Sequence, residues 1–141
     1  SINPDCRVTV HRCFYLPDTA AQFDFHDFDY IVDAIDSVPD KALLIHQATA
    51  ESTLFSSMGA GRKTSGENIR VAEFGKVAGC PLARSLRRYM KRNDLFPARK
   101  FSCVYSPELQ QRSGTIAPVV GVFGMTLANL IITNVCKNTS F

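Results

Sequence analysis

Two aspartates at the end of an apolar run form the pattern in this sequence that most suggests chemistry. The run Tyr30-Ile31-Val32-Asp33-Ala34-Ile35-Asp36-Ser37 is followed directly by Val38-Pro39-Asp40-Lys41. An apolar run without polar alternation predicts a strand covered on both faces of a parallel sheet. Ligands of such sheets bind beyond the carboxyl ends of the strands. Asp33 and Asp36 are therefore either ligand-binding carboxylates or ordinary turn and capping residues.

The residues after this run predict the start of a helix. Pro39 suits the first helical position, Ser37 can cap the helix, and Asp40 suits the positive end of the helix dipole. Lys41 lies one turn into the predicted helix. Its ammonium group either reaches back to a bound phosphate or is solvated.

The predicted elements alternate along the chain. Helices are expected at 18–23, 39–49, 81–92 and 116–136, and strands at 7–10, 29–35, 53–57, 68–74 and 101–105. This order predicts one α/β domain over residues 1–141, with strand 29–35 at the centre of a mostly parallel sheet and an antiparallel extension from the later strands. No Gly-x-Gly-x-x-Gly motif occurs. Gly59-Ala60-Gly61 follows a strand and is either a weak phosphate cradle or a site of close backbone approach.

The charge is distributed unevenly. Residues 1–60 carry three cations against nine acids, whereas residues 61–100 carry eleven cations against three acids. The predicted helix 81–92 is amphipathic and leaves four cations on its outer face: Arg84, Arg87, Arg88 and Lys91. Such a face either binds RNA phosphates or is simply solvated.

The cysteines and the apolar segment 116–132 limit other classes of function. The five cysteines stand at positions 6, 13, 80, 103 and 136 without a Cys-x-x-Cys pair, which argues against structural zinc and favours a reduced, cytoplasmic protein. Cys80 or Cys103 could be a reactive thiol, although Cys103 in an apolar strand suits an inert one. His11, His26 and His46 are expected to be surface or packing residues. The segment 116–132 contains Pro118 and Gly121 and is expected to form a buried core helix, not a membrane span.

Several of these stretches together resemble a known superfamily. They are Ile2-Asn3-Pro4-Asp5-Cys6-Arg7-Val8-Thr9-Val10, the run 30–38 with Lys41-Ala42, Gly59-Ala60-Gly61, and Pro81-Leu82-Ala83. In order and spacing they resemble the C-terminal two-thirds of the ThiF/MoeB/HesA superfamily, whose adenylating fold is that of the ubiquitin-like modifier activating enzymes. The bacterial tRNA threonylcarbamoyladenosine dehydratase branch is the most similar. The resemblance is strong from Ile2 to Gly61 and looser after Lys100.

The resemblance implies an ATP-dependent enzyme. Members adenylate an oxygen and so create a good leaving group, and the dehydratase branch closes a ring on a modified adenosine of tRNA. By resemblance, Asp36 holds magnesium and the nucleotide phosphates, and Asp33 supports it. Lys41, from its place in the helix, is the candidate contact to a nucleotide phosphate. The substrate would be tRNA, held by Arg84, Arg87, Arg88 and Lys91, and the family's homodimer is the expected assembly.

The family's glycine-rich ATP loop has no counterpart in this sequence. We therefore expect a Rossmann-like sheet truncated at its N-terminal nucleotide-binding half, and a chain that by itself binds no ATP and is inactive. The open alternatives are an adenylyltransferase for a sulfur carrier or ubiquitin-like protein, and a non-catalytic interaction or dimerisation module.

Overall fold

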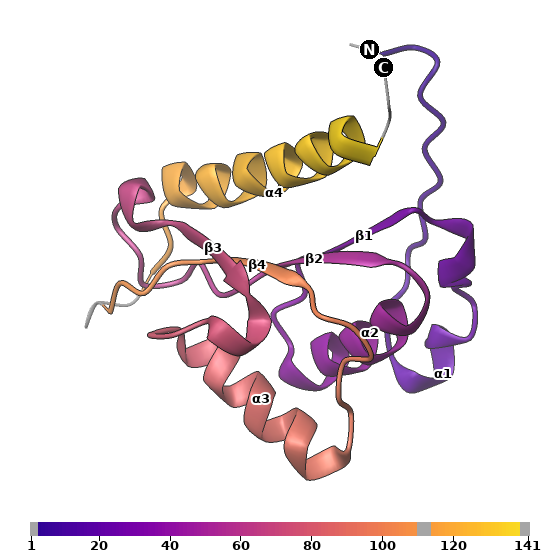
Figure 1. The fold of residues 1–141 in the computed structure, drawn as a ribbon, viewed down its shortest axis with the longest axis horizontal. Helices are drawn as coiled ribbons and strands as arrows, with labels where there is room; N and C mark the ends of the chain where they lie inside the picture. Colours follow the sequence, from indigo (N-terminus) through magenta and orange to yellow (C-terminus); the bar gives the residue numbers. More distant parts are fainter. Residues whose placement is uncertain (1–2, 110–113, 139–141) are drawn as a thin grey trace.

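A four-stranded sheet between two layers of helices organises this chain (Figure 1). The computed structural model describes residues 3–109 and 114–138. In chain order its elements are α1 (Pro17–Ala20), η1 (Phe25–Asp27), β1 (Tyr30–Asp33), α2 (Val38–Glu51), β2 (Thr53–Ser57), η2 (Gly66–Asn68), β3 (Arg70–Glu73), η3 (Phe74–Lys76), α3 (Pro81–Asn93), β4 (Ser102–Tyr105) and α4 (Ala117–Asn138).

The sheet is mixed, as the sequence predicts. Its strand order is β1-β2-β4-β3. The first three strands are parallel, and β3 pairs with β4 in the antiparallel sense. In this register Asp33 lies beside Ser56, and Ser56 lies beside Cys103. The carboxyl ends of the three parallel strands therefore meet at one end of the sheet, where a ligand is expected.

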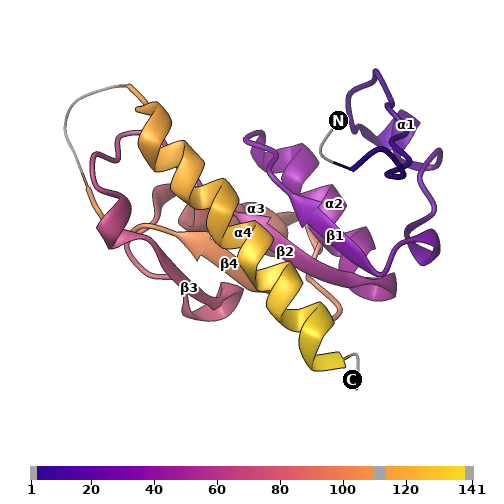
Figure 2. The ribbon, with the colours of Figure 1, turned by 90° about the horizontal axis from the view of Figure 1, so that it is seen from above.

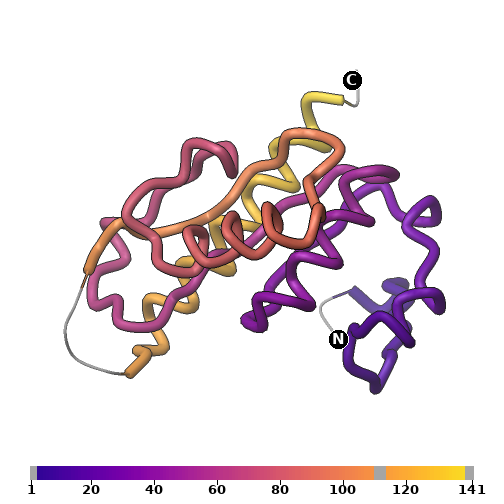
Figure 3. The backbone as a smooth tube through the Cα atoms, turned by 90° about the horizontal axis from the view of Figure 1, so that it is seen from below, coloured from indigo at the N-terminus to yellow at the C-terminus, as the bar shows by residue number. Residues whose placement is uncertain are grey.

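Each face of the sheet has its own apolar core. Figure 3 shows α2 and α3 side by side on one face, whereas α4 covers the other. The larger core lies under α2 and α3 and includes Ile45, Leu54, Leu86, Met90 and Cys103. The smaller one lies under α4 and consists of Phe55, Val104, Val119, Phe123 and Leu127. Burial on both sides of β2 and β4 explains why adjacent residues are buried in each strand, Leu54 and Phe55 in β2 and Cys103 and Val104 in β4.

The position of β1 differs from the prediction. Among the described residues β1 is an edge strand, not the central one, and its face toward α4 is covered only in part, at Tyr30, whose hydroxyl donates to Asn134 Oδ1 at 3.0 Å. Ile31 is 8% exposed under α2, whereas Val32 on the opposite face is 46% exposed. The reason is that α4 packs on β2 and β4 and crosses the sheet there (Figure 2), so Val32 of β1 stays exposed.

The N-terminal segment differs as well. Residues 7–10 do not form a strand, because no strand within residues 3–109 and 114–138 pairs with them, and all four are exposed. The first firm attachment is Tyr15, whose hydroxyl donates to Gln47 Oε1 on α2. Burial, with a smaller effect of the Glu51 carboxylate, raises the pKa of Tyr15 to about 12. Figure 2 shows this arm beyond β1 and α2, away from most of α4.

The closing helix α4 packs by a single stripe. Val119, Phe123 and Leu127 are buried, but Met125 and Ile132 are 76% and 62% exposed. The prediction of a buried core helix is therefore wrong, because the described residues cover only one side of α4. By length and composition α4 could also cross a membrane, a property that single core helices of soluble proteins share.

We expect the exposed side of α4 and the open edge of β1 to make this chain self-associate, since both are surfaces that attract another copy. The double variant Met125→Glu/Ile132→Glu places two carboxylates in that surface and should weaken self-association about tenfold or more. Sedimentation velocity over a concentration series measures the effect. Thr133→Glu adds a charge to the same helix outside the exposed apolar set and serves as the control. A wild-type chain that sediments as a monomer at all concentrations would contradict this prediction.

Candidate active site

A pocket of about 460 Å³ lies at the carboxyl end of the sheet. The turn after β1 contributes Asp36, the turn after β2 contributes Gly59 and Gly61, and the start of α3 contributes Pro81 and Leu82. Asp36 is exposed and lines this pocket. The pocket therefore has the place in the fold that ligands of open α/β sheets occupy, and it contains one of the two predicted carboxylates.

The other carboxylate, Asp33, is buried and paired with Lys41. The Lys41 ammonium lies 2.6 Å from Asp33 Oδ2 and donates to the carbonyl oxygens of Ile35, at 3.1 Å, and Ser57, at 2.8 Å. Asp33 Oδ2 also accepts from Ser56 Oγ at 2.6 Å, and Asp33 Oδ1 accepts from the Ile35 amide at 3.0 Å. Both side chains of the ion pair are fully buried. The alternative of a solvated Lys41 is therefore wrong, since its three donors are matched by three oxygens.

This ion pair fixes the turn that carries Asp36. Both backbone groups of Ile35 are bound, its amide by Asp33 and its carbonyl by Lys41. Asp36 is the next residue, and α2 begins two residues later at Val38. Ser37 occupies the N-cap position, but its side chain makes no capping hydrogen bond, so the predicted capping role is wrong. The buried charges hold this turn instead, and so they fix the backbone next to Asp36.

Two cations that line the pocket were not predicted from the sequence. Arg62 has a left-handed backbone with φ 61°, and its amide donates to the Gly114 carbonyl at 2.8 Å. Lys63 is 4% exposed, and its ammonium donates to the backbone carbonyl of Glu108. A non-glycine residue in this conformation is uncommon and often marks a functional turn. The charge of Arg62-Lys63 in the polar turn after Gly61 was the available signal in the sequence.

The segment after β4 is bound to the same turn. The Glu108 carboxylate accepts from Thr64 Oγ1 at 2.6 Å and from the amides of Thr64 and Ser65 at 3.2 Å. Glu108 and Leu109 both line the pocket. The turn after β2 and the segment after β4 are thus tied together, so the pocket has polar walls of both signs of charge.

Two glycines and one thiol line the pocket, and a second thiol, Cys103, lies in the core of the sheet. A Cβ on Gly59 would meet Leu82 at 3.5 Å, and one on Gly61 would meet Thr115 at 3.8 Å, which are ordinary contacts. Cys80 is 2% exposed and lines the pocket at the N-cap of α3. Cys103 is fully buried, and burial raises the pKa of its thiol well above the ordinary value. Cys103 is accordingly an inert core thiol.

The four predicted RNA-binding cations lie along α3, beyond the pocket. Arg84, Arg88 and Lys91 are exposed, as the amphipathic pattern predicts. Arg87 is half-buried: it donates to the Phe74 carbonyl at 3.0 Å, and its guanidinium lies 5.6 Å from the centre of the Phe74 ring. These four cations thus separate into three that are exposed and Arg87, which also binds η3. Lys91, in the last turn, also suits the negative end of the helix dipole.

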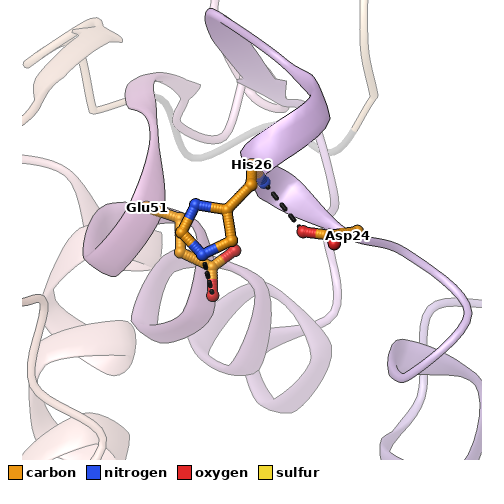
Figure 4. A group of neighbouring side chains, drawn as sticks. All are labelled: Asp24, His26 and Glu51. Carbon is orange, nitrogen blue, oxygen red and sulfur yellow. Dashed lines mark hydrogen bonds and ion pairs between the residues drawn. The ribbon is translucent and has the colours of Figure 1, made fainter.

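A second cluster of possible metal ligands lies far from this pocket. Asp24, His26 and Glu51 are exposed, and one ligand atom from each lies within 4.8 Å of the others (Figure 4). His26 Nε2 is 3.8 Å from Glu51 Oε1, and Asp24 Oδ1 accepts the His26 amide at 3.0 Å. Asp36 does not belong to this cluster. The other two histidines pack, His46 against the Phe96 carbonyl at 2.7 Å and His11 against the Phe23 ring.

Comparison with known proteins identifies relatives of one kind. No protein-family model matches this chain. The tRNA threonylcarbamoyladenosine dehydratase of Escherichia coli (strain K12) is 37% identical over 82% of this chain and 46% of its own length. The enzymes of the same name from Bacillus subtilis (strain 168) and Haemophilus influenzae are 32% and 30% identical over 67% and 92% of this chain. The chain spans about half the length of the curated relatives it matches.

Solved structures agree with the sequence relatives. The structure described as TcdA (CsdL) has a TM-score of 0.82 and 29% identity, and the match covers 97% of this chain and 63% of that one. E. coli TcdA in complex with AMP has a TM-score of 0.81 and 32% identity, and in complex with ATP 0.79 and 30%. Those matches cover 95% and 98% of this chain and 61% and 62% of the solved chains. Sequence and fold together show that this chain belongs to the tRNA threonylcarbamoyladenosine dehydratase family, the branch of the ThiF/MoeB/HesA superfamily that its motifs resemble.

Proposed function

We propose that the full-length protein is an ATP-dependent, cytoplasmic tRNA threonylcarbamoyladenosine dehydratase that works as a homodimer. One observation carries this proposal: an exposed Asp36, on a turn whose preceding residue is held by a buried ion pair, lines a pocket at the carboxyl end of the parallel strands. Solved relatives of the same fold are described as complexes with AMP and with ATP. A nucleotide pocket around Asp36 agrees with the place of this carboxylate in the fold and with the nucleotides named for these relatives.

The donor set fits a nucleotide with magnesium. Mg²⁺ is usually held by one or two carboxylates together with substrate phosphates, and Asp36 supplies one such carboxylate to the pocket. Arg62 and Lys63 bring positive charge to the same pocket, which favours binding of negatively charged phosphate oxygens. ATP, when bound, would supply the adenylyl group that turns an oxygen of the modified adenosine into a good leaving group for ring closure.

We assign Asp33 and Lys41 a positioning role. The three donors of Lys41 are directed at Asp33, Ile35 and Ser57, so its charge acts on the Asp36 turn and not on a phosphate. Asp33 is 1% exposed and accepts from Lys41, Ser56 and Ile35. Catalysis needs carboxylates held within a fraction of an ångström, and a buried support of this kind provides it.

The experiment that tests this function is the substitution Asp36→Asn in the full-length protein. It keeps the size of the side chain and removes the charge that would hold magnesium. We expect magnesium-dependent conversion of ATP in the presence of threonylcarbamoylated tRNA to fall about a hundredfold or more. Formation of AMP and pyrophosphate, and mass spectrometry of the modified nucleoside, measure both halves of the reaction.

Asp40→Asn is the matched control, because Asp40 lies in the first turn of α2 but does not line the pocket. It removes an equal charge close by and should leave turnover within about twofold, since only a small dipole effect is lost. Wild-type turnover by Asp36→Asn would overturn the assignment of Asp36. ATP conversion that depends on a small carrier protein and not on tRNA would favour the adenylyltransferase alternative.

A further inference from the structure

The far end of α3 borders a second pocket, of about 410 Å³, at the opposite end of the sheet from Asp36. It lies where β3 ends and β4 begins, beside Met90 and Lys91 in the last turns of α3 and the segment 96–101. Its apolar lining comes from Phe74, Met90, Phe96, Pro97 and Phe101. The volume is within the range of small-molecule sites, and the lining is richer in aromatic rings than the pocket at Asp36.

The aromatic rings are arranged as a floor and a rim. Phe74 and Phe101 are stacked, with centroids 5.0 Å apart and planes at 21°, and both are buried. Phe96 is 53% exposed, so one ring at the rim is accessible to a flat ligand. Its backbone carbonyl is held by His46 Nδ1 at 2.7 Å, which ties the segment after α3 to α2. The backbone that carries the exposed Phe96 ring is therefore fixed by this hydrogen bond.

Cations surround the same pocket. Arg87, Lys91, Arg99 and Lys100 all line it, against a single acid, Glu73. Lys100 is 3.9 Å from Glu73, but its side chain is 85% exposed, so this surface pair neutralises little of its charge. Arg84, Arg88 and Arg92 continue the positive charge along α3, and only Asp94 opposes it in residues 81–100. A ligand matched to this surface is negative along its length and has an apolar flat part.

We infer that this pocket takes an unpaired nucleobase of the tRNA, with neighbouring phosphates on Lys91 and the outer cations of α3; this inference rests on the proposed function. Nucleic acid combines regularly spaced negative charge with flat rings, and proteins bind unpaired bases with aromatic side chains beside cations. An acidic peptide has the charge but lacks the regular rings.

The helix α3 connects the two pockets. Pro81 and Leu82 line the candidate active site, and Met90 and Lys91 line the aromatic pocket. Nine residues of α-helix span about 14 Å, which is about the length of four stacked nucleotides at 3.4 Å each. A base in the aromatic pocket would therefore lie a few nucleotides from the modified adenosine that reacts near Asp36. Its binding would orient the RNA strand for the reaction.

The test measures binding of an unmodified tRNA transcript to the full-length protein by fluorescence anisotropy at several salt concentrations. Phe96→Leu keeps an apolar side chain but removes the ring, and should weaken binding about fivefold or more while the salt dependence stays unchanged. Phe96→Tyr keeps a ring and should bind within about twofold of wild type. Lys91→Gln should instead flatten the slope of log affinity against log salt by about 0.7 to 0.9.

Phe28→Leu is the matched control, because Phe28 is 51% exposed but does not line the aromatic pocket. It should bind tRNA like wild type. Equal binding of tRNA by Phe96→Leu and wild type would overturn the inference. The inference would also fail if polyglutamate competes with tRNA and Phe96→Leu weakens polyglutamate binding as much as tRNA binding, since that result indicates an acidic-peptide site. Binding is measured without ATP, so the two proposals can fail separately. A protein that does not turn over ATP but still loses tRNA binding in Phe96→Leu would refute the proposed function and leave the nucleobase pocket standing.

Discussion

Lys41→Met is expected to destabilise this fold by about 3–5 kcal/mol, the usual cost of removing one partner of a buried ion pair. Methionine fills a similar volume, but it leaves the Asp33 carboxylate, 1% exposed, without its cation at 2.6 Å. It also removes the donor to the Ile35 and Ser57 carbonyls. A domain of this size has a total stability of about 5–15 kcal/mol, so the variant would be close to unfolding.

Urea denaturation followed by circular dichroism measures the loss. The double variant Asp33→Asn/Lys41→Met is the informative companion, because asparagine can still accept from the Ile35 amide and hydrogen-bond with Ser56 without a buried charge. We expect it to recover at least about 1 kcal/mol relative to Lys41→Met. Lys76→Met serves as a control, since Lys76 is an exposed lysine in η3. If Lys41→Met unfolds at the wild-type urea midpoint, the buried pair is not a main support of the fold.

Reversing three exposed cations of α3 should have the largest effect on RNA binding. We expect Arg84→Glu, Arg88→Glu and Lys91→Glu together to weaken tRNA binding by the full-length protein about a hundredfold or more at low salt. The same change should make the salt dependence shallower, because fewer phosphates lose their counterions. Arg87 is left unchanged, since it donates to the Phe74 carbonyl and its reversal would disturb η3.

The matched control reverses three exposed cations elsewhere: Arg7 and Arg12 in the N-terminal segment and Lys137 at the end of α4. It changes the net charge by the same amount, so any loss due to overall charge appears equally in both variants. Electrophoretic mobility shift at several salt concentrations compares them. An identical loss in the two variants would return the α3 cations to an ordinary solvated helix face.

Local patterns in the sequence were enough for most of the elements. The predicted helix 81–92 agrees with α3 (Pro81–Asn93), and the predicted strand 53–57 agrees with β2 (Thr53–Ser57). Both depend on periodicity, which tells whether a residue faces a core but not which element forms that core. For that reason residues 7–10 resembled a strand, yet they have no partner to pair with among the described residues.

The sequence by itself determined the α/β class, the place of Asp36 in the turn after the predicted strand 29–35, and the basic face of α3, because each follows from neighbours within one or two turns of chain. Only the tertiary structure decided that Lys41 is buried against Asp33 and Ser57, that α4 keeps one side open, and that Phe96 lies at a cationic pocket. These features join residues from separate elements. Their contacts depend on strand order and on how the helices pack on the sheet, which no local pattern of residues records.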